Sequence, residues 1–183
     1  MLTNSSSRYG IISISLHWLV ALSIYSLFAL GYWMVDLTYY SNWYRTAPYW
    51  HKSVGILLFG VVMLRLLWRY SSITPAPLKS HSLVEKRLAK LTHTLLYLLM
   101  LLIMLSGYLI STADGRPISV FGWFDVPGFG ELFPQQADRA GIVHKYLAYV
   151  VIALSLLHAL AALKHHFIDK DFTLKRMFGR SAR

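Results

Sequence analysis

Apolar residues gather in long uncharged stretches along this chain. Three stretches, at residues 9–35, 91–113 and 146–163, contain 27, 23 and 18 residues without Asp, Glu, Lys or Arg. A helix rises about 1.5 Å per residue, so roughly 20 apolar residues cross the hydrocarbon core of a bilayer. These stretches therefore predict three transmembrane helices.

A fourth apolar stretch is shorter. Only 12 uncharged residues separate Lys52 from Arg65, but the apolar pattern continues through residues 66–68. An arginine near a helix end can extend its guanidinium group to the membrane surface. We therefore expect a fourth span and place the helices at residues 11–35, 51–69, 91–112 and 143–164.

Two of the expected connections are rich in aromatic residues. Residues 37–50 hold six tyrosines and tryptophans, which is typical of the interface between membrane and water: Tyr39, Tyr40, Trp43, Tyr44, Tyr49 and Trp50. The long connection at residues 113–142 contains an apolar segment, residues 118–124. This segment either lies among the lipid headgroups or covers something buried beneath it.

Charge sets the expected orientation. Of the 18 lysines and arginines, 13 lie before the first helix, between residues 65 and 90, or from Lys164 onwards. Because basic residues favour the cytoplasmic side, we expect both termini and the connection between the second and third helices in the cytoplasm. The sequence thus predicts an all-α membrane protein, a single four-helix transmembrane bundle over residues 1–183 with residues 113–142 as an outer loop.

Composition excludes several classes of protein. Charged residues make up 14% of the chain and hydrophobic residues 56%, whereas a soluble domain is about 25% charged. The formal net charge of +10 therefore reflects basic loops that hold a membrane topology, and we expect no nucleic-acid partner. The absence of cysteine excludes disulfides, iron–sulfur clusters and covalently attached haem. The first apolar stretch is too long for a cleaved signal peptide.

Histidines carry the candidate chemistry, because ionisable residues within membrane spans are functional candidates. On the last expected helix, His144 and His158 are 14 residues apart. An ideal helix places them within about 40° of one face and roughly 21 Å apart along its axis. The side chains between them on this face are small or slim, so a flat macrocycle could lie there: Ala148, Val151 and Ser155.

Matching depths in the membrane predict the partners of these two histidines. His51 opens the second helix at its outer end, as His144 does on the last helix, and His17 lies as far from the inner side as His158. Two imidazoles complete six-coordinate iron and leave no open position, which suits electron transfer. His93 competes with His17 as the partner of His158, and is otherwise a hydrogen-bond donor to a haem edge or a quinone. We expect His81, His165 and His166 at the surface.

Several neighbours of the histidines fit the same interpretation. Arg65 is a candidate partner for a haem propionate, although extension to the membrane surface explains it equally well. Lys52 directly follows an outer histidine and is either a propionate partner or an interfacial cation. Gly55, Gly60 and Gly107 permit close approach of a ring or of another helix. The sequence indicates no catalytic residue.

Five segments together resemble the bacterial cytochrome b561 family of small di-haem inner-membrane cytochromes. They read SISLHWLV at residues 13–20, HKSVGIL at 51–57, HKYL at 144–147, LHALAALKHH at 157–166 and KDFTLKRM at 170–177. The resemblance spans nearly the whole chain. It implies two haem b groups ligated by His17, His51, His144 and His158, in agreement with the pairs deduced from depth.

The resemblance also implies electron exchange with ubiquinone in the bacterial inner membrane, and leaves two functions open. Some members of the family resemble superoxide oxidases, which pass electrons from superoxide outside to ubiquinone. Others resemble the cytochrome subunits of hydrogenases and dehydrogenases, which serve a periplasmic or membrane redox partner without a catalytic reaction of their own. A third, non-redox function would leave the purified protein colourless.

Overall fold

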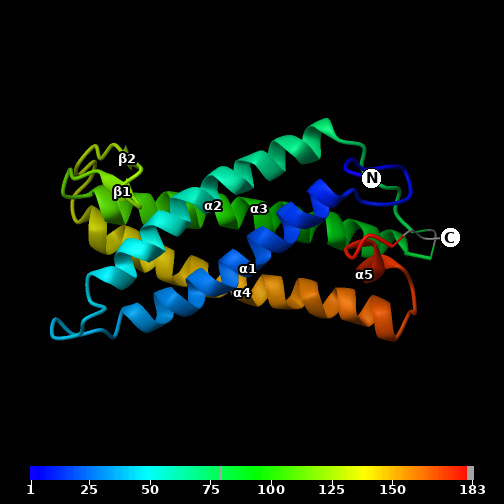
Figure 1. Ribbon diagram of the computed structural model, residues 1–183. Coiled ribbons are helices and arrows are strands. Elements are labelled where there is room, and N and C mark those ends of the chain that lie inside the picture. Colours follow the sequence, from blue (N-terminus) through cyan, green and yellow to red (C-terminus); the bar gives the residue numbers. More distant parts are fainter. Residues whose placement is uncertain (79, 181–183) are drawn as a thin grey trace. The chain divides into compact units, whose positions relative to one another are not determined.

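The computed structural model describes residues 1–78 and 80–180, so Lys79 and Arg183 of the charge analysis lie outside the described residues. Four long helices dominate the chain (Figure 1). They are α1 (Ile11–Met34), α2 (Thr46–Ser71), α3 (Leu83–Thr112) and α4 (Gln136–Phe167). A hairpin of β1 (Ile118–Val120) and β2 (Phe124–Val126) precedes α4, and the short helix α5 (Thr173–Arg176) follows it.

All four long helices are apolar enough to cross a membrane. The most apolar windows of α1, α2, α3 and α4 have mean hydropathies of 1.9, 1.6, 2.1 and 2.1. Large aliphatic side chains remain at least half exposed on every one of them, including Leu22, Leu64, Leu98 and Leu160. In water such a surface would be unfavourable, whereas lipid tails solvate it. The structure thus confirms the predicted class of helical membrane protein.

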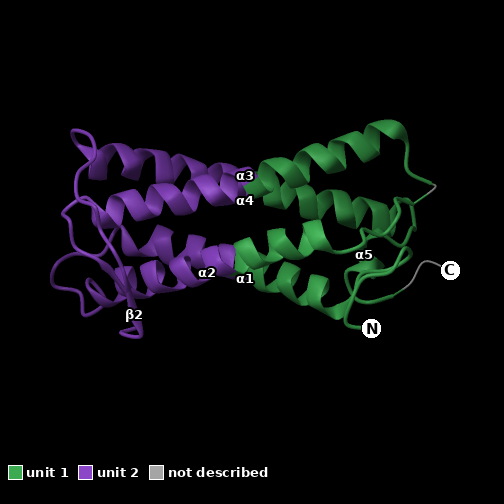
Figure 2. Ribbon diagram, turned by 90° about the horizontal axis from the view of Figure 1, so that it is seen from above, with its two compact units in different colours: residues 1–21, 61–97, 153–183 green, residues 22–60, 98–152 purple. Residues whose placement is uncertain are grey.

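The chain divides into two compact units, and each contains a part of every long helix (Figure 2). Unit 1 comprises residues 1–21, 61–97 and 153–183. Unit 2 comprises residues 22–60 and 98–152.

In unit 1 both chain ends meet the connection between α2 and α3. The Ala76 N–H donates to the Ser6 carbonyl at 2.9 Å, and Arg176 donates to the Ala76 carbonyl at 2.8 Å. The indole N–H of Trp18 on α1 donates to the Met177 carbonyl at 3.0 Å. Both termini and this connection are therefore held together, as a topology with both termini on one side of the membrane requires.

Helix α3 begins eight residues before the start expected from the apolar pattern. Ser82 and Glu85 explain the difference, because they form a capping box. The Glu85 N–H donates to Ser82 Oγ at 3.2 Å, while the Ser82 N–H donates to Glu85 Oε2 at 2.9 Å. These bonds satisfy N–H groups that a helix start leaves free, so residues 85–90 are helical although four of them are charged.

Helix α4 likewise begins before its expected start, within residues expected to form the outer loop. The fully buried Gln136 anchors this first turn. Its side-chain amide donates to the Leu109 carbonyl of α3 at 2.8 Å, and its side-chain oxygen accepts from the Leu132 N–H at 2.8 Å. A buried amide is tolerated only when it is hydrogen-bonded in this way.

The apolar part of the outer loop forms the hairpin, which covers the first turns of α2. Its turn has positive φ at Phe121 (51°) and Gly122 (70°), as turns that join twisted strands require. The Phe121 ring packs on Trp50 at a centroid distance of 5.1 Å. Ser53, which is fully buried on α2, accepts from the Phe121 N–H at 3.2 Å and donates to the Ser119 carbonyl at 3.3 Å. These contacts support the interpretation in which residues 118–124 cover buried groups, here Ser53 at the start of α2.

We predict that Ser53→Ala loosens the hairpin without unfolding α2. The variant loses both hydrogen bonds to the hairpin; at about 1 kcal/mol each, backbone amides at residues 118–126 should exchange with solvent roughly tenfold faster or more. Hydrogen–deuterium exchange measured by mass spectrometry tests this. Ser71→Ala is the matched control, because the Ser71 hydroxyl bonds only to carbonyls of its own helix. Equal exchange in the two variants would contradict the role given to Ser53.

Candidate functional site

Two of the predicted histidines face each other in unit 1. The ring centres of His17 on α1 and His158 on α4 are 6.4 Å apart, and the ring planes meet at 72°. His93 on α3 lies closer to His158, with ring centres 5.1 Å apart. The structure therefore brings together the predicted pair and also the histidine considered as its alternative.

The second predicted pair lies in unit 2 and has nearly the same geometry. The ring centres of His51 on α2 and His144 on α4 are 6.2 Å apart, and the ring planes meet at 71°. Each pair thus takes one histidine from α4 and the other from a different helix.

The spacing of the rings decides which histidines fit the two sides of one metal ion. A metal–imidazole bond is about 2 Å long, so two rings bound on opposite sides of one ion have centres roughly 6 Å apart. Both His17–His158 and His51–His144 have this spacing. The shorter separation between His93 and His158 places their rings in direct contact. The residues of both pairs therefore fit an iron atom held between two imidazoles.

Hydrogen bonds orient the His144 ring. Its Nδ1 atom lies 2.9 Å from the Ile103 carbonyl, which can only accept, so Nδ1 carries the proton. The buried Ser106 hydroxyl lies 3.1 Å from the same nitrogen and donates to the same carbonyl at 2.8 Å. A neutral imidazole protonated at Nδ1 has its lone pair on Nε2, the form that a metal ligand requires.

Two glycines of unit 2 lie directly against the rings of His51 and His144. A Cβ atom at Gly31 on α1 would lie 3.0 Å from His51 Cε1, and one at Gly107 on α3 would lie 3.1 Å from His144 Cε1. Sequence reasoning named Gly107 as a point of close approach for a ring or a helix, and it missed Gly31. Glycine inside a membrane helix was the available signal, because it admits the close approach of a neighbouring group.

Arg65 lies beside a histidine in unit 1. One guanidinium nitrogen lies 2.9 Å from His17 Nδ1. Because arginine only donates, His17 accepts through Nδ1 and a neutral ring then carries its proton on Nε2. Ligation of iron through Nε2 needs the opposite tautomer. The hydrogen bond from Arg65 and ligation by His17 through Nε2 therefore exclude each other.

Positive charge accumulates around Tyr97 in unit 1. The guanidinium groups of Arg65 and Arg69 lie 5.4 Å and 5.7 Å from the centre of its ring. Neither arginine forms an ion pair with a carboxylate in the described part of the chain. This region can therefore hold an anionic group.

A small pocket of unit 1 opens next to these groups. Its lining combines hydrogen-bonding side chains with the apolar side chain of Leu66, and consists of Leu66, Arg69, Tyr70, His93, Thr94 and Tyr97. His93 thus contributes both to this pocket and to the contact with His158. Such a lining suits a ring that carries polar oxygen atoms.

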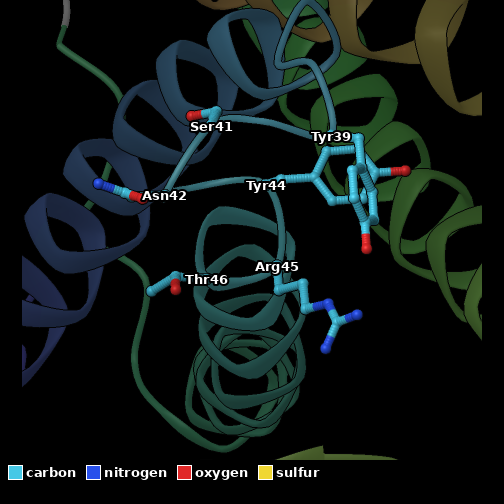
Figure 3. Close-up of a pocket in the computed structure, with 6 residues that line it drawn as sticks. All are labelled: Tyr39, Ser41, Asn42, Tyr44, Arg45 and Thr46. Carbon is cyan, nitrogen blue, oxygen red and sulfur yellow. The ribbon is translucent and has the colours of Figure 1, made fainter.

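The aromatic connection between α1 and α2 forms an open pocket of about 370 Å³ in unit 2 (Figure 3). The Tyr39 and Tyr44 rings lie together on one side, and Arg45 is the cationic residue of its lining. None of the residues that line it is a histidine, so it is separate from the predicted metal ligands. Lys52, which follows His51 on α2, is exposed.

Two histidines expected at the surface are mostly buried instead. The side chains of His81 and His165 are only 16% and 14% exposed, and both lie close to Asp171. Sequence reasoning treated them singly. It could not foresee that the connection between α2 and α3 and the segment after α4 pack against each other.

Comparisons with a family model and with individual proteins both point to cytochrome b561 proteins. A family model described as prokaryotic cytochrome b561 matches residues 8–180. The chain is 56% identical over 180 residues to cytochrome b561 homolog 2 of Escherichia coli (strain K12), covering 98% of this chain and 96% of the relative.

Two more distant relatives also match over nearly their full length. The probable superoxide oxidase CybB of Yersinia pestis is 30% identical, over 93% of this chain and 95% of the relative. Cytochrome b561 homolog 1 of Escherichia coli (strain K12) is 29% identical, over 95% of this chain and 98% of the relative.

We predict that Gly107→Ala weakens haem binding at the His51–His144 pair alone. The added methyl group would lie 3.1 Å from the His144 ring, so the ring must move away from its present position. We expect loss of about half or more of the haem predicted at this pair, measured as haem per chain after purification. Gly141→Ala on α4 is the control, because a Cβ atom there meets nothing within 4 Å. Full haem content in Gly107→Ala would show that this contact does not position His144.

Proposed function

Because the chain belongs to the prokaryotic cytochrome b561 family of membrane electron-transfer proteins, we propose that it binds two haem b groups and carries electrons across the bacterial inner membrane. One observation carries the proposal, namely the matched geometry of the two histidine pairs. Their ring centres are 6.4 Å and 6.2 Å apart, and their planes meet at 72° and 71°. If the histidines had met by chance, there would be no reason for the two pairs to have the same distance and angle between their rings.

In this proposal His17 and His158 hold the inner haem, and His51 and His144 hold the outer one. When bound, haem iron supplies one-electron chemistry by cycling between its ferric and ferrous forms. Because two histidines would hold each haem, the sites would suit electron transfer rather than oxygen binding. Gly31 and Gly107 leave the space that the rings of His51 and His144 occupy, and the Ile103 carbonyl fixes the tautomer of His144.

The orientation rests on charge. The α2–α3 connection and both chain ends are rich in lysine and arginine and are held together in unit 1. We place them in the cytoplasm, in accordance with the positive-inside rule. The hairpin and the aromatic connection then face the periplasm.

Arg65 and Lys52 are the proposed partners of haem propionates. Arg65 must release His17 for that ring to ligate iron through Nε2, and the freed guanidinium then needs an anionic partner. A propionate provides one through charge-assisted hydrogen bonds. Lys52 follows His51 in the sequence and is exposed, and it could serve an outer propionate in the same way.

We place ubiquinone in the small pocket lined by Arg69, His93 and Tyr97. The side chains of all three can donate hydrogen bonds to quinone carbonyls. His93 also touches the inner ligand His158, so an electron leaving the inner pair would have a short path to the pocket. This gives His93 a function other than ligation.

Superoxide is the electron donor that we favour. Two superoxide ions would each lose one electron to become dioxygen, and the two electrons with two protons would convert one ubiquinone to ubiquinol. The supporting observation is the relative named a probable superoxide oxidase. Arg139, Lys52 and Lys145 remain as outer cations that could attract an anion. Arg116 is less available, because its hydrogen bonds to Asp114 neutralise it and hold the pKa of that carboxyl below its usual range.

A redox partner protein is the second candidate donor. Large apolar side chains of the outer loop are more than 60% exposed, namely Trp123, Phe129 and Leu132. Exposed apolar groups on one loop suit a protein interface. In this case the chain would be an electron-transfer subunit without its own catalytic reaction.

We predict that each pair holds one haem independently. His158→Ala should remove only the inner haem and His144→Ala only the outer one, so that each variant retains about half of the haem of the unaltered protein. Pyridine haemochrome analysis measures the content, and reduced-minus-oxidised spectra show whether the remaining haem is low-spin. Loss of both haems from each variant, with the protein still inserted and folded, would contradict two separate sites.

The partner of His158 can be tested in the same series. His17→Ala should remove the inner haem, whereas His93→Ala should leave it bound and impair quinone reduction. The opposite result would make His93 the ligand.

We predict that superoxide supplied outside reduces quinone within the membrane. The measurement uses liposomes with oriented protein, superoxide generated outside and ubiquinone in the bilayer, and follows quinone reduction. His51→Ala, shown to lack the outer haem, should lower the rate to the background of protein-free liposomes. An unchanged rate in this variant would exclude the proposed path. Absence of reduction by the unaltered protein would favour the partner-dependent electron carrier.

A further inference from the structure

A third histidine cluster in unit 1 combines residues from three separate segments. His81 lies in the connection between α2 and α3, His165 in the last turn of α4, and Asp171 in the segment between α4 and α5. One potential metal-binding atom of each lies within 4.8 Å of the others. All three residues are largely shielded from solvent, with side chains 16%, 14% and 8% exposed. None of them has a part in the proposed haem or quinone sites.

The separations of these atoms are close to those of ligands around one ion, although the shorter one is at present a hydrogen bond between His81 and Asp171. His81 Nε2 lies 2.8 Å and His165 Nδ1 lies 3.3 Å from Asp171 Oδ2. Zinc–nitrogen and zinc–oxygen bonds of about 2 Å in a tetrahedral arrangement put neighbouring ligand atoms roughly 3.3 Å apart. An ion facing all three atoms could therefore be bound with small side-chain movements.

The His165 ring gives the most specific observation. Its Nδ1 atom is buried and lies 2.7 Å from Asp169 Oδ2, yet it has no hydrogen-bond partner in the described part of the chain. Neither this carboxylate nor that of Asp171 lies in a favourable direction for an N–H bond. A buried polar atom without a partner is costly. A cation bound by the lone pair of His165 Nδ1 and by the nearby carboxylates would give this nitrogen a partner and would remove the unfavourable free energy.

Further hydrogen bonds hold the Asp171 carboxylate toward the histidines. Its Oδ1 atom accepts from the Thr173 N–H at 2.7 Å, which leaves Oδ2 facing the histidine rings. The Asp171 N–H donates to the His165 carbonyl at 3.0 Å and ties these two residues together. The carboxylate is thus oriented by supporting contacts, as metal ligands are.

We propose that His81, His165 and Asp171 bind a divalent transition-metal ion, with zinc as the best match. Two imidazole nitrogens and one carboxylate oxygen suit zinc. The fourth position would belong to water or to Asp169. Asp169 already pairs with Lys164 at 2.7 Å, so it is the weaker candidate. Such an ion would join the α2–α3 connection to the segment after α4 and fix the position of α5.

Zinc binding by the full-length, haem-loaded protein in detergent tests the proposal. The protein carries a tag without histidine, is stripped with a chelator and is then dialysed against buffered zinc, and bound zinc is measured by mass spectrometry. We expect about one zinc ion per chain. His81→Ala and Asp171→Asn should each weaken zinc binding by about 100-fold or more, because loss of a contact that merely supports a ligand already costs about 10–100-fold. His166→Ala is the matched control, since it removes the adjacent histidine without touching the cluster, and should bind as the unaltered protein does.

A second measurement separates a metal site from a network of hydrogen bonds. Zinc should slow hydrogen–deuterium exchange at residues 169–177 in the unaltered protein and in His166→Ala, but not in Asp171→Asn. Asparagine keeps the size of the side chain and an oxygen for the Thr173 N–H, and an unchanged haem spectrum verifies that this variant folds. Absence of bound zinc in the unaltered protein, or equal loss of zinc in His166→Ala and His81→Ala, would overturn the proposal.

Discussion

The histidine side chains that lie within the apolar helices govern this structure. Backbone groups within the helices satisfy one another, so these imidazoles are among the polar groups that the helical hydrogen bonds leave unpaired at depth. They meet across helices in two pairs with ring centres 6.2 Å and 6.4 Å apart. Gly31 and Gly107 provide the close approach that one of these pairs needs, and the hairpin covers the adjacent end of α2.

Sequence alone was sufficient for the four apolar helices and for the histidines that meet. The helices follow from the length of uncharged stretches, and the histidines follow from the depth of each residue in its helix. Depth constrains partners strongly because a membrane fixes the direction and level of every span. For this reason a partner could be predicted for His17 and for His51 without any tertiary information, while His93 stayed open as an alternative to His17.

The missed features depend on side-chain hydrogen bonds or on packing between distant segments. The early start of α3 could have been predicted, because Ser82 and Glu85 have the spacing of a capping box. The early start of α4 was not, because it depends on contacts of Gln136 with Leu109 and Leu132. The burial of His81 likewise depends on Asp171, which is 90 residues away. Charge suggested Arg65 as a propionate partner. The hydrogen bond from Arg65 to His17 Nδ1, which sets the tautomer of that ring, could not be predicted from the sequence.

Helix α4 runs without interruption from Gln136 to Phe167 and supplies one histidine to each pair. Because the helix is continuous, its turn and rise per residue fix the direction and distance of His144 relative to His158. A single residue inserted between His144 and His158 would turn one ligand by about 100° relative to the other and shift it by about 1.5 Å. Both pairs could not then be formed together, so length variation among functional relatives should be confined to the connections and absent from this interval of α4.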